Sequence, residues 1–174
     1  MPIESTQIVQ TASRIVDRCG SRDPRKIADE LGIVILECPF HRQRGAYKII
    51  QRNRFIFVKQ DLHPVMKDIV LLHEIGHDTL HRREATAAGG FQEFEIFNMA
   101  SSRMEYEANV FAAQAALDDE AFLTCCAEGF DAQQIACALH SDVNLVALKA
   151  DTLIARGYRL RPQAHDNTFL RGKR

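Results

Sequence analysis

The stretch His73-Glu74-Ile75-Gly76-His77 lies inside a run, from near residues 61–64 to about residue 82, whose apolar positions recur at helical spacing. Two histidines four positions apart on a helix are about 40° apart around the axis and about 6 Å apart along it, so both imidazoles can reach one ion. Glu74 is rotated by about 100° from His73, where it can contact a water on the metal without binding the metal. This spacing predicts a zinc site of the peptidase type.

The predicted helix has one apolar half, and the two histidines lie in the middle of it. Within about 100° of His73 are the apolar residues Val65, Met66, Ile69, Val70, Leu72 and Leu80. The other half carries Lys67, Asp68, Asp78 and Arg82. Burying two imidazoles without partners is costly, and a bound metal ion offsets that cost. A pair of hydrogen-bonded core histidines is the alternative interpretation.

A catalytic zinc site needs three protein ligands and leaves one position for water. The candidates for the third ligand are the acidic residues after the first helix, namely Glu84, Glu93, Glu95, Glu105 and Glu107. On a second helix, predicted over residues 102–117, Glu105 shares a face of small side chains with Asn109 and Ala112, a face suited to close packing against another helix. We therefore favour Glu105. Glu107, which can pair with Arg103 four residues earlier, is the alternative ligand.

Three further side chains could assist this site. Asn109, one turn after Glu105, could accept the free ring N–H of a metal-bound histidine and fix its tautomer. His81 could contact the substrate, or it could place a positive charge at the C-terminal end of its helix. Tyr106 could stabilise an oxyanion, although an aromatic residue on a helix flank more often packs.

The remaining sequence predicts a mainly helical α+β protein with a small antiparallel sheet. Strands are predicted over residues 33–38, 47–50 and 55–58, the last two joined as a hairpin. Helices are predicted over residues 5–19 and 24–31, and three more follow the candidate N-caps Asp118, Asp131 and Ser141 or Asp142. Residues 83–101 show no clean period. We divide the chain into a core, residues 1–117, and a C-terminal helical extension, residues 118–174, that ends in a basic tail.

Composition places few constraints on partners. The 174 residues carry a net charge of -1 and are 46% hydrophobic, so no strong overall field favours nucleic acid or membrane. The five cysteines include no Cys-x-x-Cys pair, and the N-terminus lacks a secretory pattern, which together favour the reducing cytoplasm. No apolar run approaches the roughly 20 residues needed to span a bilayer.

Two motifs together resemble a known family. His73-Glu74-Ile75-Gly76-His77-Asp78-Thr79-Leu80-His81 and Glu105-Tyr106-Glu107-Ala108-Asn109-Val110-Phe111-Ala112-Ala113 are similar to the paired motifs of the ImmA/IrrE family of bacterial and phage metallopeptidases. The resemblance covers roughly residues 5–160 and implies a gluzincin-like minimal peptidase core.

The resemblance also implies roles for single residues. His73, His77 and Glu105 would hold zinc, and Glu74 would be the catalytic base. Members of the family cleave helix-turn-helix repressors, often encoded beside them, and thereby switch on phage, mobile-element or stress genes. This chain has Ala115-Ala116-Leu117-Asp118 where many members have Leu-Met-Pro, so substrate contacts there are in doubt.

The expected function is a cytoplasmic zinc endopeptidase that hydrolyses a peptide bond in such a repressor. Mn²⁺ or Fe²⁺ could occupy the same ligands. Glu74 would take a proton from the attacking water and later deliver it to the leaving amine. The scissile segment could bind extended along the edge of the hairpin at residues 47–58.

Two other functions are compatible with parts of the sequence. The helices predicted after Asp131 and Asp142 could form a DNA-binding helix-turn-helix. The second of these helices offers only Lys149 and Arg156 against Asp142 and Asp151, which argues against direct nucleic-acid binding. A protein-binding module with a metal site but no peptidase activity is the third hypothesis, and the intact Glu74 argues against it.

Overall fold

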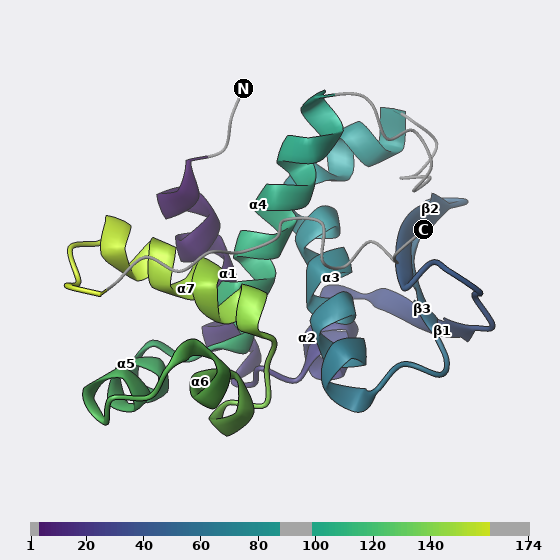
Figure 1. Ribbon diagram of the computed structural model, residues 1–174. Coiled ribbons are helices and arrows are strands. Elements are labelled where there is room, and N and C mark those ends of the chain that lie inside the picture. The colour runs from purple at the N-terminus through teal and green to yellow at the C-terminus, as the bar shows by residue number, and fades with distance from the viewer. Residues whose placement is uncertain (1–3, 88–98, 161–174) are drawn as a thin grey trace.

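The structure, a computed structural model, describes residues 4–87 and 99–160. Within these ranges, seven helices and three strands follow one another along the chain (Figure 1). They are α1 (Ser5–Cys19), α2 (Pro24–Leu31), β1 (Ile33–Cys38), β2 (Gly45–Ile50), β3 (Asn53–Lys59), α3 (Pro64–Ala87), α4 (Met99–Ala116), α5 (Asp119–Ala127), α6 (Ala132–Ala138) and α7 (Val143–Ala155). The predicted α+β class is confirmed.

Local signals in the sequence explain most helix boundaries. The side chain of Asp23 accepts a hydrogen bond from the backbone N–H of Arg25 at the start of α2. Asp118, Asp131 and Asp142 cap α5, α6 and α7 in the same way. A cap of this kind stabilises a helix by about 1 kcal/mol relative to alanine. These capping residues are the predicted ones, with Asp142 rather than Ser141 at α7.

The sheet differs from the small antiparallel sheet that the sequence predicted. Its strand order is β1-β3-β2, with β2 antiparallel to β3 but β1 parallel to β3, so the sheet is mixed. The hairpin itself is confirmed, and it turns at Gln51 and Arg52, which both have positive φ. The hairpin places β3 rather than β2 beside β1, where Ile35 pairs with Ile56. That pairing is non-local, and hydropathy does not specify its direction.

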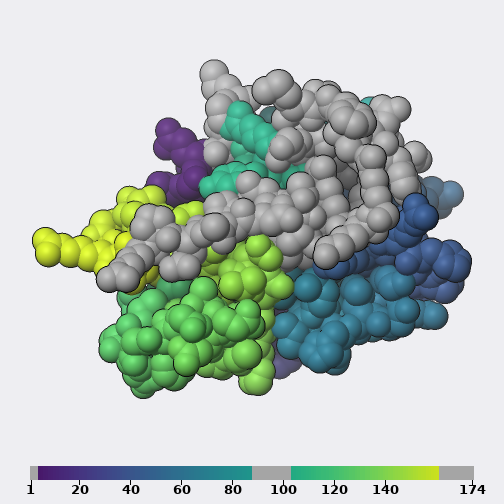
Figure 2. All heavy atoms as spheres, viewed as in Figure 1, coloured from purple at the N-terminus to yellow at the C-terminus, as the bar shows by residue number. Residues whose placement is uncertain are grey.

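Helix α3 is the central element of the molecule. It packs against β2 and β3 on one side and against α4 on the other, and α4 in turn packs against α1 and α7. One cluster of buried hydrophobic side chains includes residues from Ile8 in α1 to Leu153 in α7. On the face drawn in Figure 2, α5 to α7 lie to one side, and α3 and the sheet lie to the other. None of the described helices is long and apolar enough to cross a membrane.

The segment without a clean period, residues 83–101, is divided between three parts of the chain. Residues 83–87 continue α3, which kinks at His81 (φ -124°, ψ 19°), and residues 99–101 begin α4. Residues 88–98 and most of the predicted basic tail, residues 161–174, lie outside the described residues. The division of the chain at residue 117 stays a prediction.

Candidate metal centre

Two histidines of α3 and one glutamate of α4 converge at the interface between these helices. Nε2 of His73 and Nε2 of His77 are 3.0 Å apart, and each lies 3.3 Å from one carboxylate oxygen of Glu105. Both histidines are almost fully buried, whereas 24% of the Glu105 side chain is exposed. We refer to these three residues as the metal group, because their potential ligand atoms all lie within 4.8 Å of one another. Glu105, the third ligand that the sequence favours, is therefore a member of this group.

Gly76 explains how α3 and α4 come close enough to form this group. A Cβ atom at Gly76 would lie 3.2 Å from both Cα and O of Ala108, and 3.2 Å from Cδ1 of Phe111. A residue larger than glycine would therefore press on the backbone of α4. Glycine and alanine at the crossing let Glu105, one turn before Ala108, reach the two histidines.

Asn109 lies behind His73. Its Oδ1 atom is 2.8 Å from Nδ1 of His73, and both side chains are buried. A carbonyl oxygen only accepts hydrogen bonds, so Nδ1 of His73 carries the proton. When Nδ1 carries the only ring proton, Nε2 points a lone pair into the metal group. This contact is the one that the sequence suggested for Asn109.

His81 and Glu107 lie behind His77. Nδ1 of His77 is 3.2 Å from Nδ1 of His81, whose Nε2 is 2.9 Å from Oε2 of Glu107. Nε of Arg103 donates to the other oxygen of Glu107 at 2.8 Å. His81 and Glu107 are only 2% and 5% exposed, so burial gives no support to His81 as a substrate contact, and both roles suggested for it stay predictions. Glu107 is not in the metal group; the predicted pair with Arg103 forms, but the carboxylate is buried.

The donor chemistry of the metal group fits a divalent cation. Two imidazole lone pairs and a carboxylate face one another, and acceptors at such distances repel unless a cation lies between them. Burial lowers the pKa of His77 to about 4, although the neighbouring Glu105 opposes this. The ring is therefore neutral at pH 7, as a metal ligand must be. One carboxylate and two imidazoles are a ligand set known for catalytic zinc.

Glu74 adjoins the start of β2. An ideal Cβ atom on Gly45 would lie 2.8 Å from Oε1 of Glu74 and 2.5 Å from Cγ1 of Val70. Gly45 thus leaves room for the carboxylate beside the first residue of the strand. Glu74 is itself 5% exposed. The side chain of Glu74, the candidate base, therefore lies beside the start of β2, an edge strand of the sheet.

Other candidate residues are not brought to the metal group. Tyr106 lies near Ser5 and Asp151, on the side of α4 that faces α1 and α7, and burial raises its pKa. Glu84 is exposed on α3, and Glu93 and Glu95 lie outside the described residues. Nothing in this placement supports a role for Tyr106 as an oxyanion donor.

Sequence reasoning missed the burial of Asp78, the residue after His77. It was assigned to the polar half of its helix, yet it is 0% exposed. Its carboxylate accepts hydrogen bonds from Tyr47 at 2.6 Å, from Arg54 at 2.9 Å and from Arg82 at 2.6 Å. An acidic residue next to a metal-ligand motif is one signal that could have drawn attention to it.

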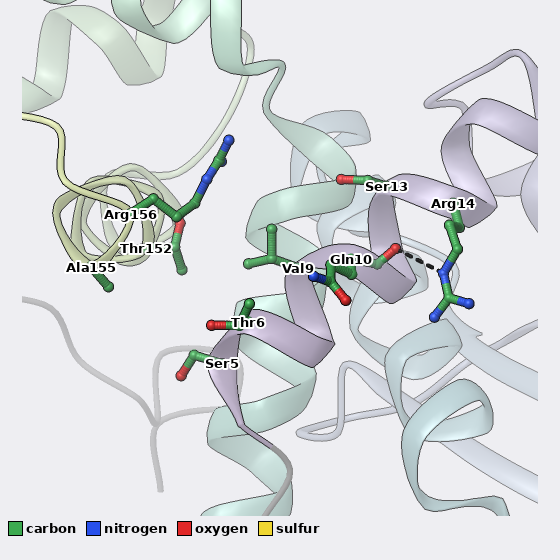
Figure 3. Close-up of a pocket in the computed structure, with 9 residues that line it drawn as sticks. All are labelled: Ser5, Thr6, Val9, Gln10, Ser13, Arg14, Thr152, Ala155 and Arg156. Atoms are coloured by element: carbon green, nitrogen blue, oxygen red, sulfur yellow. Dashed lines mark hydrogen bonds between the residues drawn. The ribbon is translucent and has the colours of Figure 1, made fainter.

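A cavity of about 560 Å³ lies away from this centre, between α1 and α7 (Figure 3). Polar residues in its lining include Ser13, Arg14, Thr152 and Arg156. None of the lining residues belongs to the metal group or contacts it through the hydrogen bonds described above. The cavity is therefore separate from the metal centre.

Comparison with known proteins identifies the family. The family model described as Peptidase_M78, IrrE N-terminal-like domain, matches residues 28–150, which include the whole metal group. The chain belongs to the Peptidase_M78 family. This Peptidase_M78 protein is also 29% identical over 115 residues to "Uncharacterized immunity region protein 2" of Bacillus phage phi105, covering 66% of this chain and 70% of the phage protein. The resemblance to ImmA/IrrE metallopeptidases is confirmed at the level of the family, which points to a metallopeptidase-type hydrolase.

Proposed function

We propose that the protein is a zinc-dependent endopeptidase that cleaves an intracellular regulatory protein of the helix-turn-helix repressor class and so relieves repression. The observation that carries the proposal is the convergence of His73, His77 and Glu105, with Glu74 directly after His73 in the sequence. Membership of a metallopeptidase family supports the chemistry. The relative from a phage is named as an immunity region protein, which supports a regulatory substrate.

The residues of the site have separate tasks in this reaction. Zinc, when bound, would polarise the scissile carbonyl and acidify its water. Glu74 takes the proton of the attacking water and later delivers it to the leaving amine. Asn109 keeps Nε2 of His73 free of a proton, so that this nitrogen can bind the metal.

The scissile segment is proposed to bind in an extended conformation along β2. Among the described strands, β2 lies at one edge of the sheet, and its first residue, Gly45, adjoins Glu74. An edge strand offers free backbone donors and acceptors to a peptide. A proline placed next to the scissile bond of the substrate should therefore reduce cleavage, and unchanged cleavage would contradict this binding mode.

The decisive experiment incubates the purified protein with the repressor encoded beside its gene, with added zinc and with a chelator. We expect a specific cut that the chelator abolishes. Glu74→Gln should retain zinc but lose about 10²- to 10⁴-fold in turnover, the usual contribution of a general base. Glu84→Gln, a change at an exposed position of the same helix, is the matched control and should cleave normally.

Two results would contradict the proposal. Normal cleavage by Glu74→Gln would show that Glu74 is not the base. Zinc binding without any cleavage of the repressor would favour the alternative of a protein-binding module with a metal site.

The DNA-binding alternative loses support from the positions of its basic residues. Lys149 is fully buried and donates to Gln114 at 2.7 Å and also to Asp119. Arg156 donates to the same Asp119 carboxylate. Lys149 is thus withdrawn from solvent, and Arg156, although exposed, is already paired with a carboxylate, so the helix offers too little free positive charge to neutralise several phosphates of a duplex. Binding of DNA with a steep salt dependence would restore this alternative.

A further inference from the structure

We propose that His81 is a positioning residue for His77, and that Glu107 and Arg103 hold His81 in the orientation that this task requires. The proposal rests on the proposed function, because it assigns His77 to the metal. It concerns a row of side chains that runs from the metal group towards solvent. The row begins at His77, continues through His81 and Glu107, and ends at Arg103, whose side chain is 41% exposed.

The proton positions along this row follow from the chemistry of its members. The Glu107 carboxylate can only accept hydrogen bonds, so Nε2 of His81 carries a proton and donates it. When Nε2 carries the only ring proton of His81, Nδ1 has a lone pair, 3.2 Å from Nδ1 of His77. Nδ1 of His77 must therefore be the donor in that contact. Its Nε2 atom is left without a proton, and this is the atom that faces Glu105 and His73.

The burial of charged residues in this row indicates that they have a role besides packing. A leucine could occupy the volume of His81 without an ionised partner, whereas burying the Glu107 carboxylate is costly unless both its oxygens are hydrogen-bonded. Arg103 and His81 supply those bonds, one to each oxygen. Helix α3 also kinks at His81, the one residue of α3 with non-helical backbone angles.

The two metal-binding histidines would be held in different ways. His73 donates to the neutral amide of Asn109, whereas His77 donates to an imidazole that is itself bound to a carboxylate. The imidazole of His81 would fix the ring orientation and tautomer of His77, as carboxylate and carbonyl partners do for other metal-bound histidines. We therefore expect zinc affinity to depend on His81, although His81 is not itself a metal ligand in this proposal.

The experiment compares His81→Leu with His81→Gln. Leucine removes both hydrogen bonds, while the glutamine amide can accept from His77 and donate to Glu107. Zinc affinity is measured by competition with a chelator, and the ring tautomers are read from side-chain ¹H–¹⁵N spectra of the metal-free and zinc-loaded proteins at about pH 8, where free histidine is neutral. His140→Gln, a change at an exposed position, is the control.

We expect His81→Leu to weaken zinc binding by about 10- to 100-fold, the usual effect of losing such a partner, and His81→Gln to retain most of the affinity. The wild-type spectra should place the proton of His77 on Nδ1 and that of His81 on Nε2. His81→Leu should mix the two tautomers of His77 in the metal-free protein. A defect confined to packing would not move this tautomer signal.

Several outcomes would overturn the proposal. One is a His81→Leu protein whose zinc affinity and His77 tautomer match the wild type. Another is a wild-type spectrum with the His77 proton on Nε2, a measurement that remains decisive if His81→Leu does not fold. Failure of the wild type to bind zinc would contradict the proposed function, whereas zinc binding that is insensitive to His81→Leu contradicts this proposal alone.

Discussion

Two glycines control the spacing around the metal group, each by leaving out a Cβ atom. Gly76 permits the close approach of α3 to the backbone of α4 at Ala108, and Gly45 leaves room for the carboxylate of Glu74. Neither Gly76 nor Gly45 has a positive φ, so the backbone conformation does not require glycine at either position. The required space is created by contacts between elements, and the two positions should affect different functions of the site.

Gly76→Ala should weaken zinc binding. The added methyl group would lie 3.2 Å from backbone atoms of Ala108, so α4 would have to shift and carry Glu105 with it. Alanine is a better helix former than glycine by about 1 kcal/mol, which would partly offset the loss of stability but not the displaced ligand. We expect about a tenfold loss of zinc affinity in a chelator competition, with Glu84→Ala as the control. Unchanged affinity would contradict this account of the crossing.

Gly45→Ala should impair catalysis and spare the metal. The new methyl group would collide with Val70 and displace the carboxylate of Glu74, and its three nearest atoms all belong to these two residues rather than to the metal group. Turnover is expected to fall by about tenfold or more, since a misplaced general base loses much of its effect. Zinc affinity should match the wild type. A combined loss of affinity and turnover would point to a wider disruption instead.

At the scale of elements, Asp78 connects the metal helix to the sheet. It accepts hydrogen bonds from Tyr47 of β2 and Arg54 of β3, and Arg54 also donates to the carbonyl of Leu31 at the end of α2. Burial, followed by the hydrogen bond to Asp78, raises the pKa of Tyr47. The residue directly after His77 is therefore bonded to two strands and, through Arg54, to the end of α2, which keeps α3 in register with the sheet.

Asp78→Asn should destabilise the fold. The amide cannot satisfy three donors, and it leaves the positive charge of Arg54 without its counter-ion. Arg82, the other arginine that pairs with Asp78, is half exposed, so solvent screens part of this interaction. We therefore expect the free energy of unfolding to fall by about 2–3 kcal/mol, less than the 3–5 kcal/mol for breaking a fully buried pair. Asp68→Asn, at an exposed position of the same helix α3, breaks the pair with Arg25 of α2 and should cost less than about 1 kcal/mol. Urea denaturation of the two variants tests the difference, and equal losses would contradict it.

At the scale of the whole molecule, a buried polar network joins four helices. Lys149 of α7 donates to Gln114 of α4 and to Asp119 of α5, and Gln114 in turn donates to Ser13 of α1. Burial lowers the pKa of Lys149 to about 8, so the ammonium remains mostly charged at pH 7. The helix that carries Glu105 is thereby connected to the C-terminal helices through charged and polar contacts.

This network predicts a pH dependence of stability. Burial raises the pKa of Asp119, but hydrogen bonds from Lys149 and Arg156 outweigh it and lower the pKa from 3.8 to about 2. Asp119 therefore binds a proton more weakly in the folded chain than in the unfolded chain. Its stabilisation is complete above the unfolded value and is lost as the pH falls from 3.8 towards 2.

The wild type should accordingly have a higher Tm than Asp119→Asn above about pH 4, and this difference should shrink as the pH falls through the window. Thermal unfolding of both proteins across acidic pH measures it. A difference in Tm that stays constant with pH would contradict the assignment to Asp119.

The sequence alone determined those features that depend on neighbours along the chain. Helix ends follow from aspartate caps and from glycines such as Gly20 and Gly32, because capping involves residues only a few positions away. The pairing of His73 with His77 follows from helix geometry, and the small-residue face of α4 indicated Glu105. Each of these signals is local, so it can be read without knowing the fold.

Only the tertiary structure decided which polar residues are buried, and in which direction β1 runs beside β3. Asp78, Glu107 and Lys149 have the charges of surface residues, and their helical positions suggested solvent. Each is buried because a partner distant in sequence satisfies it: Tyr47 and Arg54, His81, and Asp119, respectively. Burial of a charge depends on such partners being brought close, and only the packing of the elements determines that.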